Sequence, residues 1–185
     1  MLCTPFGDSA RTFATTPREH RPAAAGLRDS RRMTTSAGLV LFRERDGTLE
    51  VLLGHMGGPF WARRDEGAWS IPKGELDEGE DPLAGARREF AEELGHAAPG
   101  GPVIELGEIR QKGGKRVIAF ATEGDVDPQA IVPGTFEMEW PPRSGRRQAF
   151  PEVDRVAWFD LETAAAKLVR GQAVLLERLA DARSG

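Results

Sequence analysis

The alternation of apolar and polar residues becomes regular only from Ser36 onward, and from there it predicts a series of short strands. Apolar and β-branched residues fill 36–44 and 49–56, and the Asp-Gly pair between these runs is a strong turn signal, so together they predict a β-hairpin. Similar runs predict further strands at 68–74, 103–111, 116–124, 135–140 and 153–159. Residues 141–152 are rich in Pro, Arg and Gly, which predicts a loop.

One segment has the periodicity of an amphipathic α-helix. Its apolar residues fall on one face at about 100° per residue: Leu83, Ala86, Phe90 and Leu94. Asp81 suits the N-cap, Pro82 the first helical position and Gly95 the left-handed residue that closes a helix, so we predict a helix over 82–94. Residues 160–182 predict one or two more helices. Because strands outnumber helices and form hairpins, the pattern predicts an α/β fold with helices laid against a mixed or largely antiparallel sheet.

Residues 1–32 differ from the rest of the chain. They are rich in Arg, Ala, Ser, Thr and Pro, and their apolar residues have no period. We therefore expect a disordered N-terminal extension, with an organelle transit signal, or an upstream extension before a start at Met33, as the alternatives. The remaining residues, 33–185, have the length of one domain.

The composition limits the cellular compartment and the kinds of binding partner that we expect for the chain. The net charge of −4 gives no overall attraction to nucleic acid or to an anionic membrane. The lone Cys3 cannot form an internal disulfide and fits a reducing compartment. No run approaches the roughly 18 apolar residues of a membrane helix. We therefore expect a cytoplasmic protein without membrane or nucleic-acid partners.

The stretch from Gly74 to Gly95 contains eight acidic residues in twenty-two. Within the predicted helix, Glu89, Glu92 and Glu93 share one face beside the apolar stripe, where residues three and four apart are neighbours. Their charges repel one another and lie near the helix C-terminus, where the macrodipole disfavours negative charge. A divalent cation would reverse both effects, and hard oxygen ligands suit Mg²⁺ or Mn²⁺. A solvated helix face is the alternative.

The spacing of the whole stretch resembles a known motif. Arg88 can pair with Glu80, which would attach the preceding loop to the helix and orient Glu89. The full pattern consists of Gly74, Glu80, Arg88-Glu89-Phe90, Glu92-Glu93 and Gly95. This pattern is similar to the Nudix box, so the chain resembles the Nudix hydrolase superfamily. The one departure is His96, where the family usually has a bulky aliphatic residue.

The resemblance implies a fold and a chemistry. It implies a Nudix-type α/β/α sandwich with a mixed β-sheet. It also implies an enzyme that uses Mg²⁺ or Mn²⁺ to hydrolyse a nucleoside diphosphate linked to another group. The implied metal ligands are Glu89, Glu92, Glu93 and the carbonyl of Gly74. The implied catalytic residues are Glu89 or Glu152 as general base, with Arg88 and Glu80 in support. Glu137 and Glu139 are rivals of Glu152, but they alternate with apolar residues and are expected to face solvent.

Other residues are candidates for binding the substrate. Lys73, Lys112 and Lys115 are candidate phosphate ligands, and the predicted aromatic contact to a base is Trp61, with Phe60 and Trp140 as alternatives. The Pro-Lys-Gly opening of the box resembles the diadenosine polyphosphate and diphosphoinositol branches. We therefore predict a metal-dependent pyrophosphohydrolase of a nucleoside triphosphate or dinucleoside polyphosphate. The alternatives are a hydrolase of ADP-ribose or a diphosphoinositol phosphate, and a non-catalytic nucleotide-binding regulator.

Overall fold

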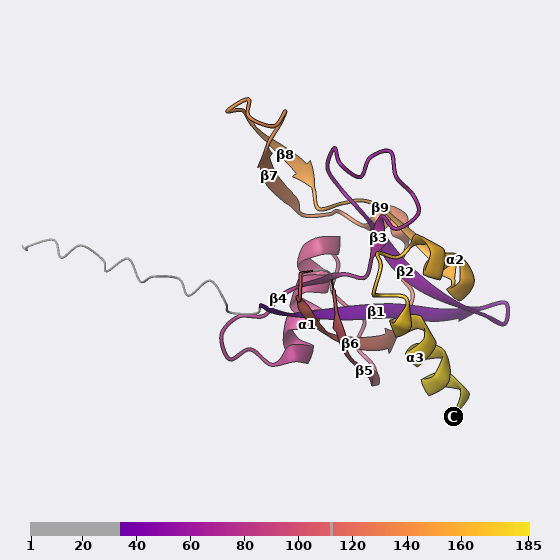
Figure 1. The fold of residues 1–185 in the computed structure, drawn as a ribbon. Helices are drawn as coiled ribbons and strands as arrows, with labels where there is room; N and C mark the ends of the chain where they lie inside the picture. The colour runs from indigo at the N-terminus through magenta and orange to yellow at the C-terminus, as the bar shows by residue number, and fades with distance from the viewer. Residues whose placement is uncertain (1–33, 112) are drawn as a thin grey trace, which may run out of the picture. The chain divides into compact units, whose positions relative to one another are not determined.

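A computed structural model describes residues 34–111 and 113–185 (Figure 1). The extension predicted for 1–32 lies outside the described residues. The strands are β1 Thr35–Arg45, β2 Thr48–Met56, β3 Trp69–Ser70, β4 Lys73–Glu75, β5 Val103–Arg110, β6 Arg116–Glu123, β7 Thr135–Glu139, β8 Arg147–Pro151 and β9 Val153–Asp160. The helices are α1 Pro82–Leu94, α2 Leu161–Lys167 and α3 Val174–Ser184, with a short 3₁₀ turn, η1, at Pro128–Ala130. In the described part of the chain, no helix is long and apolar enough to cross a membrane.

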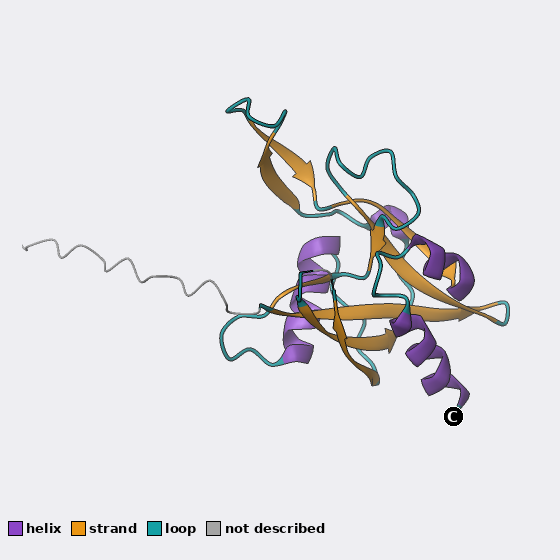
Figure 2. Ribbon diagram, in the orientation of Figure 1, coloured by secondary structure: helices purple, strands orange, loops and turns teal. Residues whose placement is uncertain are grey.

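Within the described residues, seven strands form one mixed sheet, in the order β3-β2-β1-β6-β5 with β4 on β1 and β9 on β2 (Figure 2). The predicted hairpin is confirmed as β1 and β2, whose turn places Asp46 and Gly47 at positive φ. Strand β1 is central because it pairs with β6 in parallel along most of its length. One half of its other edge pairs with β2 and the other half with β4.

The strand predicted at 68–74 divides into two. Trp69–Ser70 pairs with β2, whereas Lys73–Glu75 pairs with β1. The division falls at Pro72, which has no N–H for a ladder and instead accepts a hydrogen bond from the Leu39 amide at 3.0 Å. The chain therefore crosses from one sheet neighbour to the other just before the acidic stretch.

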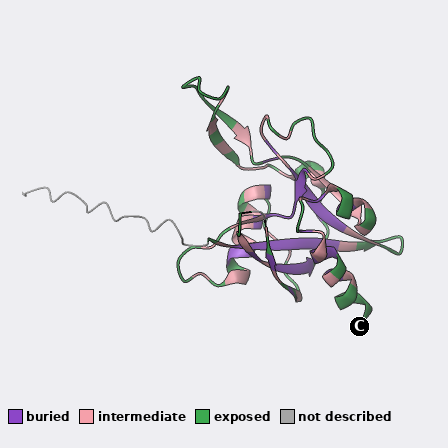
Figure 3. Cartoon of the chain, viewed as in Figure 1, coloured by how far each residue is buried: buried purple, intermediate pink, exposed green. Residues whose placement is uncertain are grey.

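Side chains that alternate along the strands build a core on each face of the sheet. On β1, Leu39 and Leu41 pack with Phe90 and Leu94 of α1. The intervening Val40 and Phe42 belong to the core on the opposite face, which includes residues of α2 and α3: Ala164, Leu175, Leu176 and Leu179. Figure 3 shows this burial along the centre of the sheet. The α/β/α sandwich is therefore confirmed.

Helix α1 has the predicted bounds and both predicted ends. The Asp81 carboxylate accepts from the Ala84 amide at 2.9 Å, and Gly95 has a left-handed φ of 61°. The 160–182 segment forms two helices, α2 and α3, and the carboxylate of Asp160 caps the first by accepting from the Thr163 amide at 2.9 Å.

The prediction of a loop over 141–152 is confirmed for 141–146 but is wrong for 147–151. Residues 147–151 form strand β8, which pairs with β7 in a two-stranded hairpin separate from the main sheet. Figure 1 shows this hairpin projecting away from the sheet. The segment Arg147–Ala149 is exposed, so it has no buried face to produce an apolar alternation. Glu137 and Glu139 are exposed on β7, as expected.

Candidate active site

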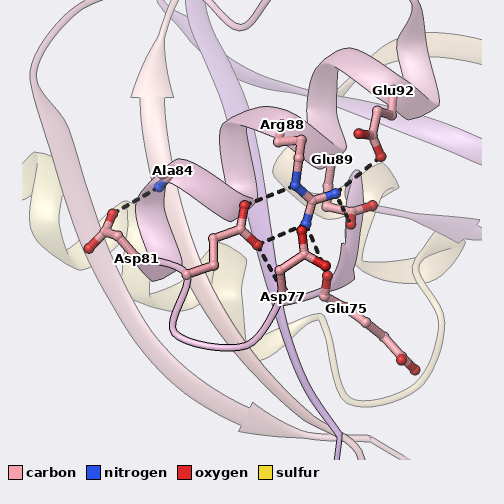
Figure 4. Close-up of polar contacts among 8 residues, drawn as sticks. Glu75, Asp77, Asp81, Ala84, Arg88, Glu89 and Glu92 are labelled. Atoms are coloured by element: carbon pink, nitrogen blue, oxygen red, sulfur yellow. Dashed lines mark hydrogen bonds and ion pairs between the residues drawn. The ribbon is translucent and has the colours of Figure 1, made fainter. Parts of the chain in front are cut away.

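Arg88 organises the acidic stretch into one network (Figure 4). Its Nε and Nη2 donate to the two oxygens of Glu80, each at 2.9 Å, in a bidentate pair. Its Nη1 donates to Glu89 at 2.7 Å and to Glu92 at 3.1 Å, and its Nη2 also donates to the Glu75 carbonyl at 3.0 Å. The pair predicted between Arg88 and Glu80 is therefore present, and the same guanidinium holds two of the three helix glutamates.

The network fixes the charge of its members. The Arg88 hydrogen bonds, helped by the Asp77 amide, lower the pKa of Glu80 to about 2. In turn, the hydrogen bonds from Arg88 to the carboxylates of Glu80 and Glu89 raise the pKa of Arg88. The loop and the helix are thus joined by groups that stay ionised in the neutral pH range. The Asp77 side chain is exposed and makes no contact in this network, whereas its backbone N–H does.

Glycine at position 74 allows a carboxylate to lie directly against the backbone. A Cβ at this position would overlap the carboxylate of Glu89. Strand β4 brings Gly74 to this place by pairing it with Ala37 of β1. The side chain of Glu89 is only 13% exposed, so its carboxylate is enclosed between the glycine and Arg88. This contact explains why the box opens on glycine.

The pKa of Glu93 is shifted in the opposite direction from that of Glu80. Burial raises the pKa of Glu93 to about 7, opposed by the charge of Lys73 and by the Lys73 amide, which donates to Glu93 Oε2 at 3.3 Å. The charges of Glu152 and Glu89 raise this pKa further. Burial in turn lowers the pKa of Lys73, whose ammonium group interacts with Glu93, Lys115 and Glu89. The side chains of Lys73 and Glu93 are thus both partly withdrawn from water, and their charges attract each other.

Glu152, which is far from the acidic stretch in the sequence and directly precedes β9, lies near the same site. Its amide donates to the Gly134 carbonyl at 2.9 Å. A Cβ at position 134 would lie 3.0 Å from the Glu92 carbonyl oxygen and 3.3 Å from Glu152 Oε2. Within the described residues, the Glu152 carboxylate makes no hydrogen bond or ion pair. It is an exposed carboxylate beside the C-terminal half of α1.

The predicted substrate ligands lie in different places. Lys115 reaches the site from the β5–β6 turn, with Nζ 4.0 Å from Glu75 Oε1, whereas Lys112 lies outside the described residues. Trp61 is half-buried against the core and stacks with Arg64, so it is packed rather than free. Its neighbour Phe60 is 58% exposed and contacts Trp140 edge-on, with ring centroids 5.3 Å apart.

Sequence reasoning missed the side chain that anchors this part of the chain. His55 is fully buried, and its Nδ1 lies 2.6 Å from Asp154 Oδ1. Its Nε2 lies 2.7 Å from the Arg64 carbonyl oxygen. His55 thus joins β2, the loop after it and the start of β9, two residues beyond Glu152. A single histidine in a strand gives no signal of such a partner, because the partner is far away in the sequence.

The donor set matches a hard divalent cation in its chemistry. Glu89, Glu92, Glu93 and Glu152 offer carboxylate oxygens, and Gly74 offers a carbonyl. Burial is the main cause of the raised pKa of Glu93, and the negative charges of Glu152 and Glu89 add to it. In the described part of the chain, no three such side chains converge on one point. Glu89 and Glu92 both accept from Arg88 Nη1. The residues therefore fit the cation by type and by charge.

The mixed sheet between helices, with the glutamate-bearing helix α1 next to the Lys-Gly strand β4, agrees with the fold expected of a Nudix protein. The family model of the NUDIX domain matches residues 32–179, which is most of the chain. The chain therefore belongs to the NUDIX domain family, and the resemblance seen in the box is confirmed.

Relatives and solved structures agree with this assignment. The chain is 30% identical over 154 residues to an 8-oxo-(d)GTP phosphatase of Mycolicibacterium smegmatis, in a match that covers 75% of this chain but only 38% of that relative. The crystal structure of the C. elegans Ap4A hydrolase binary complex matches with a TM-score of 0.57 at 22% identity, over 82% of this chain and 98% of that one. The NUDIX domain of Shewanella oneidensis NrtR, complexed with ADP ribose, matches with a TM-score of 0.56 at 18% identity, over 82% and 88%. At these identities, the two structures show a common fold.

Burial of Glu93 leads to a prediction for the metal-free protein. A group whose pKa is raised on folding, here from 4.5 to about 7, destabilises the native state increasingly as pH rises through that interval. In chelator at pH 8, Glu93→Gln should therefore raise the melting temperature, by about 5 °C. At pH 5 the gain should nearly vanish, because native Glu93 is already protonated. Thermal unfolding followed by circular dichroism tests this, and an equal gain at both pH values would contradict it.

Proposed function

We propose that the chain is a metal-dependent pyrophosphohydrolase that cleaves a phosphoanhydride bond of a nucleoside triphosphate or a dinucleoside polyphosphate. The observation that carries the proposal is that the charges of Glu89 and Glu152 both act on the carboxyl group of Glu93, next to the half-buried Lys73. The names of an 8-oxo-(d)GTP phosphatase and an Ap4A hydrolase among the similar proteins support it. The first of these names contains a nucleoside triphosphate, and the second contains a dinucleoside polyphosphate.

Each side chain of the site has a proposed task. Glu89, Glu92, Glu93 and the Gly74 carbonyl would hold Mg²⁺ or Mn²⁺. The bound cation would neutralise the diphosphate and make a water molecule more acidic. Hydrolysis adds that water across one P–O–P bond, so that its oxygen bonds to phosphorus and the bridging oxygen leaves with the other phosphate group.

The remaining groups handle the proton and the phosphate charge. Glu152 is the better placed general base of the two candidates, because its carboxylate is not held by an arginine, whereas Arg88 holds that of Glu89. Lys73 and Lys115 would contact the phosphate oxygens from one side. Arg88 keeps Glu89 against Gly74 and does not need to touch the substrate.

The experiment is a product assay over a panel of substrates. Release of phosphate and nucleoside monophosphate would be measured with nucleoside triphosphates, dinucleoside polyphosphates, ADP-ribose and a diphosphoinositol phosphate, each with Mg²⁺ and with chelator. We expect turnover of a nucleoside triphosphate or dinucleoside polyphosphate in Mg²⁺ and its loss in chelator. Equal turnover in chelator would refute the dependence on a metal ion. Turnover of ADP-ribose alone, or of the diphosphoinositol phosphate alone, would favour the alternative hydrolases. Nucleotide binding without turnover would favour a regulator.

A further inference from the structure

Gln172, in the linker between α2 and α3, is a fully buried polar residue. Its side-chain Oε1 accepts a hydrogen bond from the Ile71 amide at 3.0 Å. Its Nε2 donates to Ser70 Oγ at 3.1 Å. A buried amide group destabilises the fold unless its polar atoms are bonded. The two hydrogen bonds therefore hold this side chain against residues 70 and 71.

A tight turn fixes the backbone that carries Gln172. The Gln172 amide donates to the Val169 carbonyl at 3.1 Å, and Gly171 of this turn has a φ of 96°, which favours glycine. The Gln172 carbonyl accepts from the Leu175 amide at 2.9 Å, at the start of α3. The Val169 amide donates to the Trp69 carbonyl at 2.8 Å. Because its backbone is held on both sides, Gln172 can fix the position of the groups that it binds.

The residues bound by Gln172 belong to the crossover from β3 to β4. Ile71 lies in neither strand, and its amide is the group that Gln172 binds. The next residue, Pro72, accepts from the Leu39 amide at 3.0 Å. The crossover is therefore held at two points, by Gln172 through Ile71 and by β1 through Pro72.

The crossover leads directly into two groups of the proposed active site. Lys73 and Gly74 follow Pro72 and form most of β4, which has only three residues. The ring of Pro72 restricts rotation of the backbone between Ile71 and Lys73, so a shift of Ile71 is passed on to both. The groups of a binding site must lie within about 0.5 Å of their working positions. The place of Ile71 therefore matters for the Gly74 carbonyl.

We propose that Gln172 is a positioning residue of the active site. By holding the β3–β4 crossover, it sets the places of Lys73 and of the Gly74 carbonyl relative to the glutamates of α1. Gln172 is itself fully buried, so it acts without touching the substrate. The inference rests on the proposed function. It differs from a role in stability alone, because it predicts weaker metal binding by a chain that is still folded.

The test compares the wild-type chain with Gln172→Met, whose side chain has a similar length but no amide group. Calorimetry measures the Kd of Mg²⁺ without substrate, and steady-state kinetics measures kcat for the best substrate of the panel at saturating Mg²⁺. Groups that orient metal ligands contribute factors of about 10 to 100, so Gln172→Met should raise the Kd about tenfold and lower kcat about tenfold. Ser70→Ala removes only the hydroxyl group that Nε2 binds and keeps the bond to the Ile71 amide. It should change both values in the same directions by about threefold.

Leu179→Val is the control for a loss of stability alone. Leu179 is fully buried on α3, about two helical turns after Gln172. Its variant should lower the melting temperature and leave the Kd of Mg²⁺ and kcat unchanged.

The outcomes separate this inference from the proposed function. Wild-type values of the Kd and kcat in Gln172→Met, or the same changes in Leu179→Val, would overturn the inference. If Gln172→Met failed to fold, wild-type values in Ser70→Ala would overturn it. A wild-type chain that binds no Mg²⁺ and turns over no substrate would instead overturn the proposed function, and this inference with it.

Discussion

Glu89→Gln and Glu93→Gln are each expected to lower kcat about a thousandfold, which corresponds to about 4 kcal/mol of lost transition-state stabilisation. The substitution keeps the size of the side chain but removes the charge that would bind the cation. Glu89 lies against Gly74, and Glu93 lies against the Lys73 amide, so each substitution removes a charge at a defined place in the site. Steady-state turnover of the best substrate of the panel, at saturating Mg²⁺, measures the effect.

Asp77→Asn is the matched control for these variants. Asp77 lies in the same acidic stretch, but its side chain is exposed and outside the Arg88 network. The kcat of Asp77→Asn should stay within about twofold of the wild-type value, since changes on the surface that remove no buried contact or hydrogen bond have small effects. If Glu93→Gln retained wild-type turnover, the glutamate cluster would be only a solvated helix face.

Arg88→Lys is expected to lower kcat about a hundredfold, although the charge is kept. A lysine cannot form the bidentate pair with Glu80 while also donating to Glu89 and to the Glu75 carbonyl. The groups that orient metal ligands typically contribute factors of about 10 to 100 in activity or metal affinity. The same kinetic assay, with circular dichroism to verify folding, measures this loss.

Arg87→Lys provides the comparison for Arg88→Lys. Arg87 is the preceding residue on α1 and makes no contact with the carboxylates described above. It should retain nearly full turnover. Equal losses in the two variants would indicate a general sensitivity of the helix, and the orienting role of Arg88 would then be refuted.

Sequence patterns predicted those parts of the site that are local in the chain. The bounds of α1 follow from an N-cap, a proline and a closing glycine within one segment. The Arg88–Glu80 pair also lies within one loop and helix, so spacing was enough to predict it. Glu152 was predicted only through the resemblance to the family, because nothing in its own surroundings indicates that β9 begins beside α1.

The parts that sequence could not predict depend on contacts between distant segments. Strand β8 has no buried face, and its partner strand alone makes it a strand. The anchoring of the 57–67 loop needs His55, Asp154 and Arg64 in one place. The choice between Phe60 and Trp61 depends on which ring the core covers, and neighbours in an irregular loop give no period from which to decide it.

The proposed divalent-cation site is tested most directly by measuring whether Mg²⁺ raises the melting temperature at pH 8, for the wild-type chain and for Glu93→Gln. A ligand that binds only the native state stabilises it by about 2.7 kcal/mol at a hundredfold excess over its Kd. We predict a clear rise for the wild-type chain that saturates with Mg²⁺, and a much smaller rise for Glu93→Gln at the same concentrations. The same rise in both proteins, or no rise in either, would contradict a metal site on this helix.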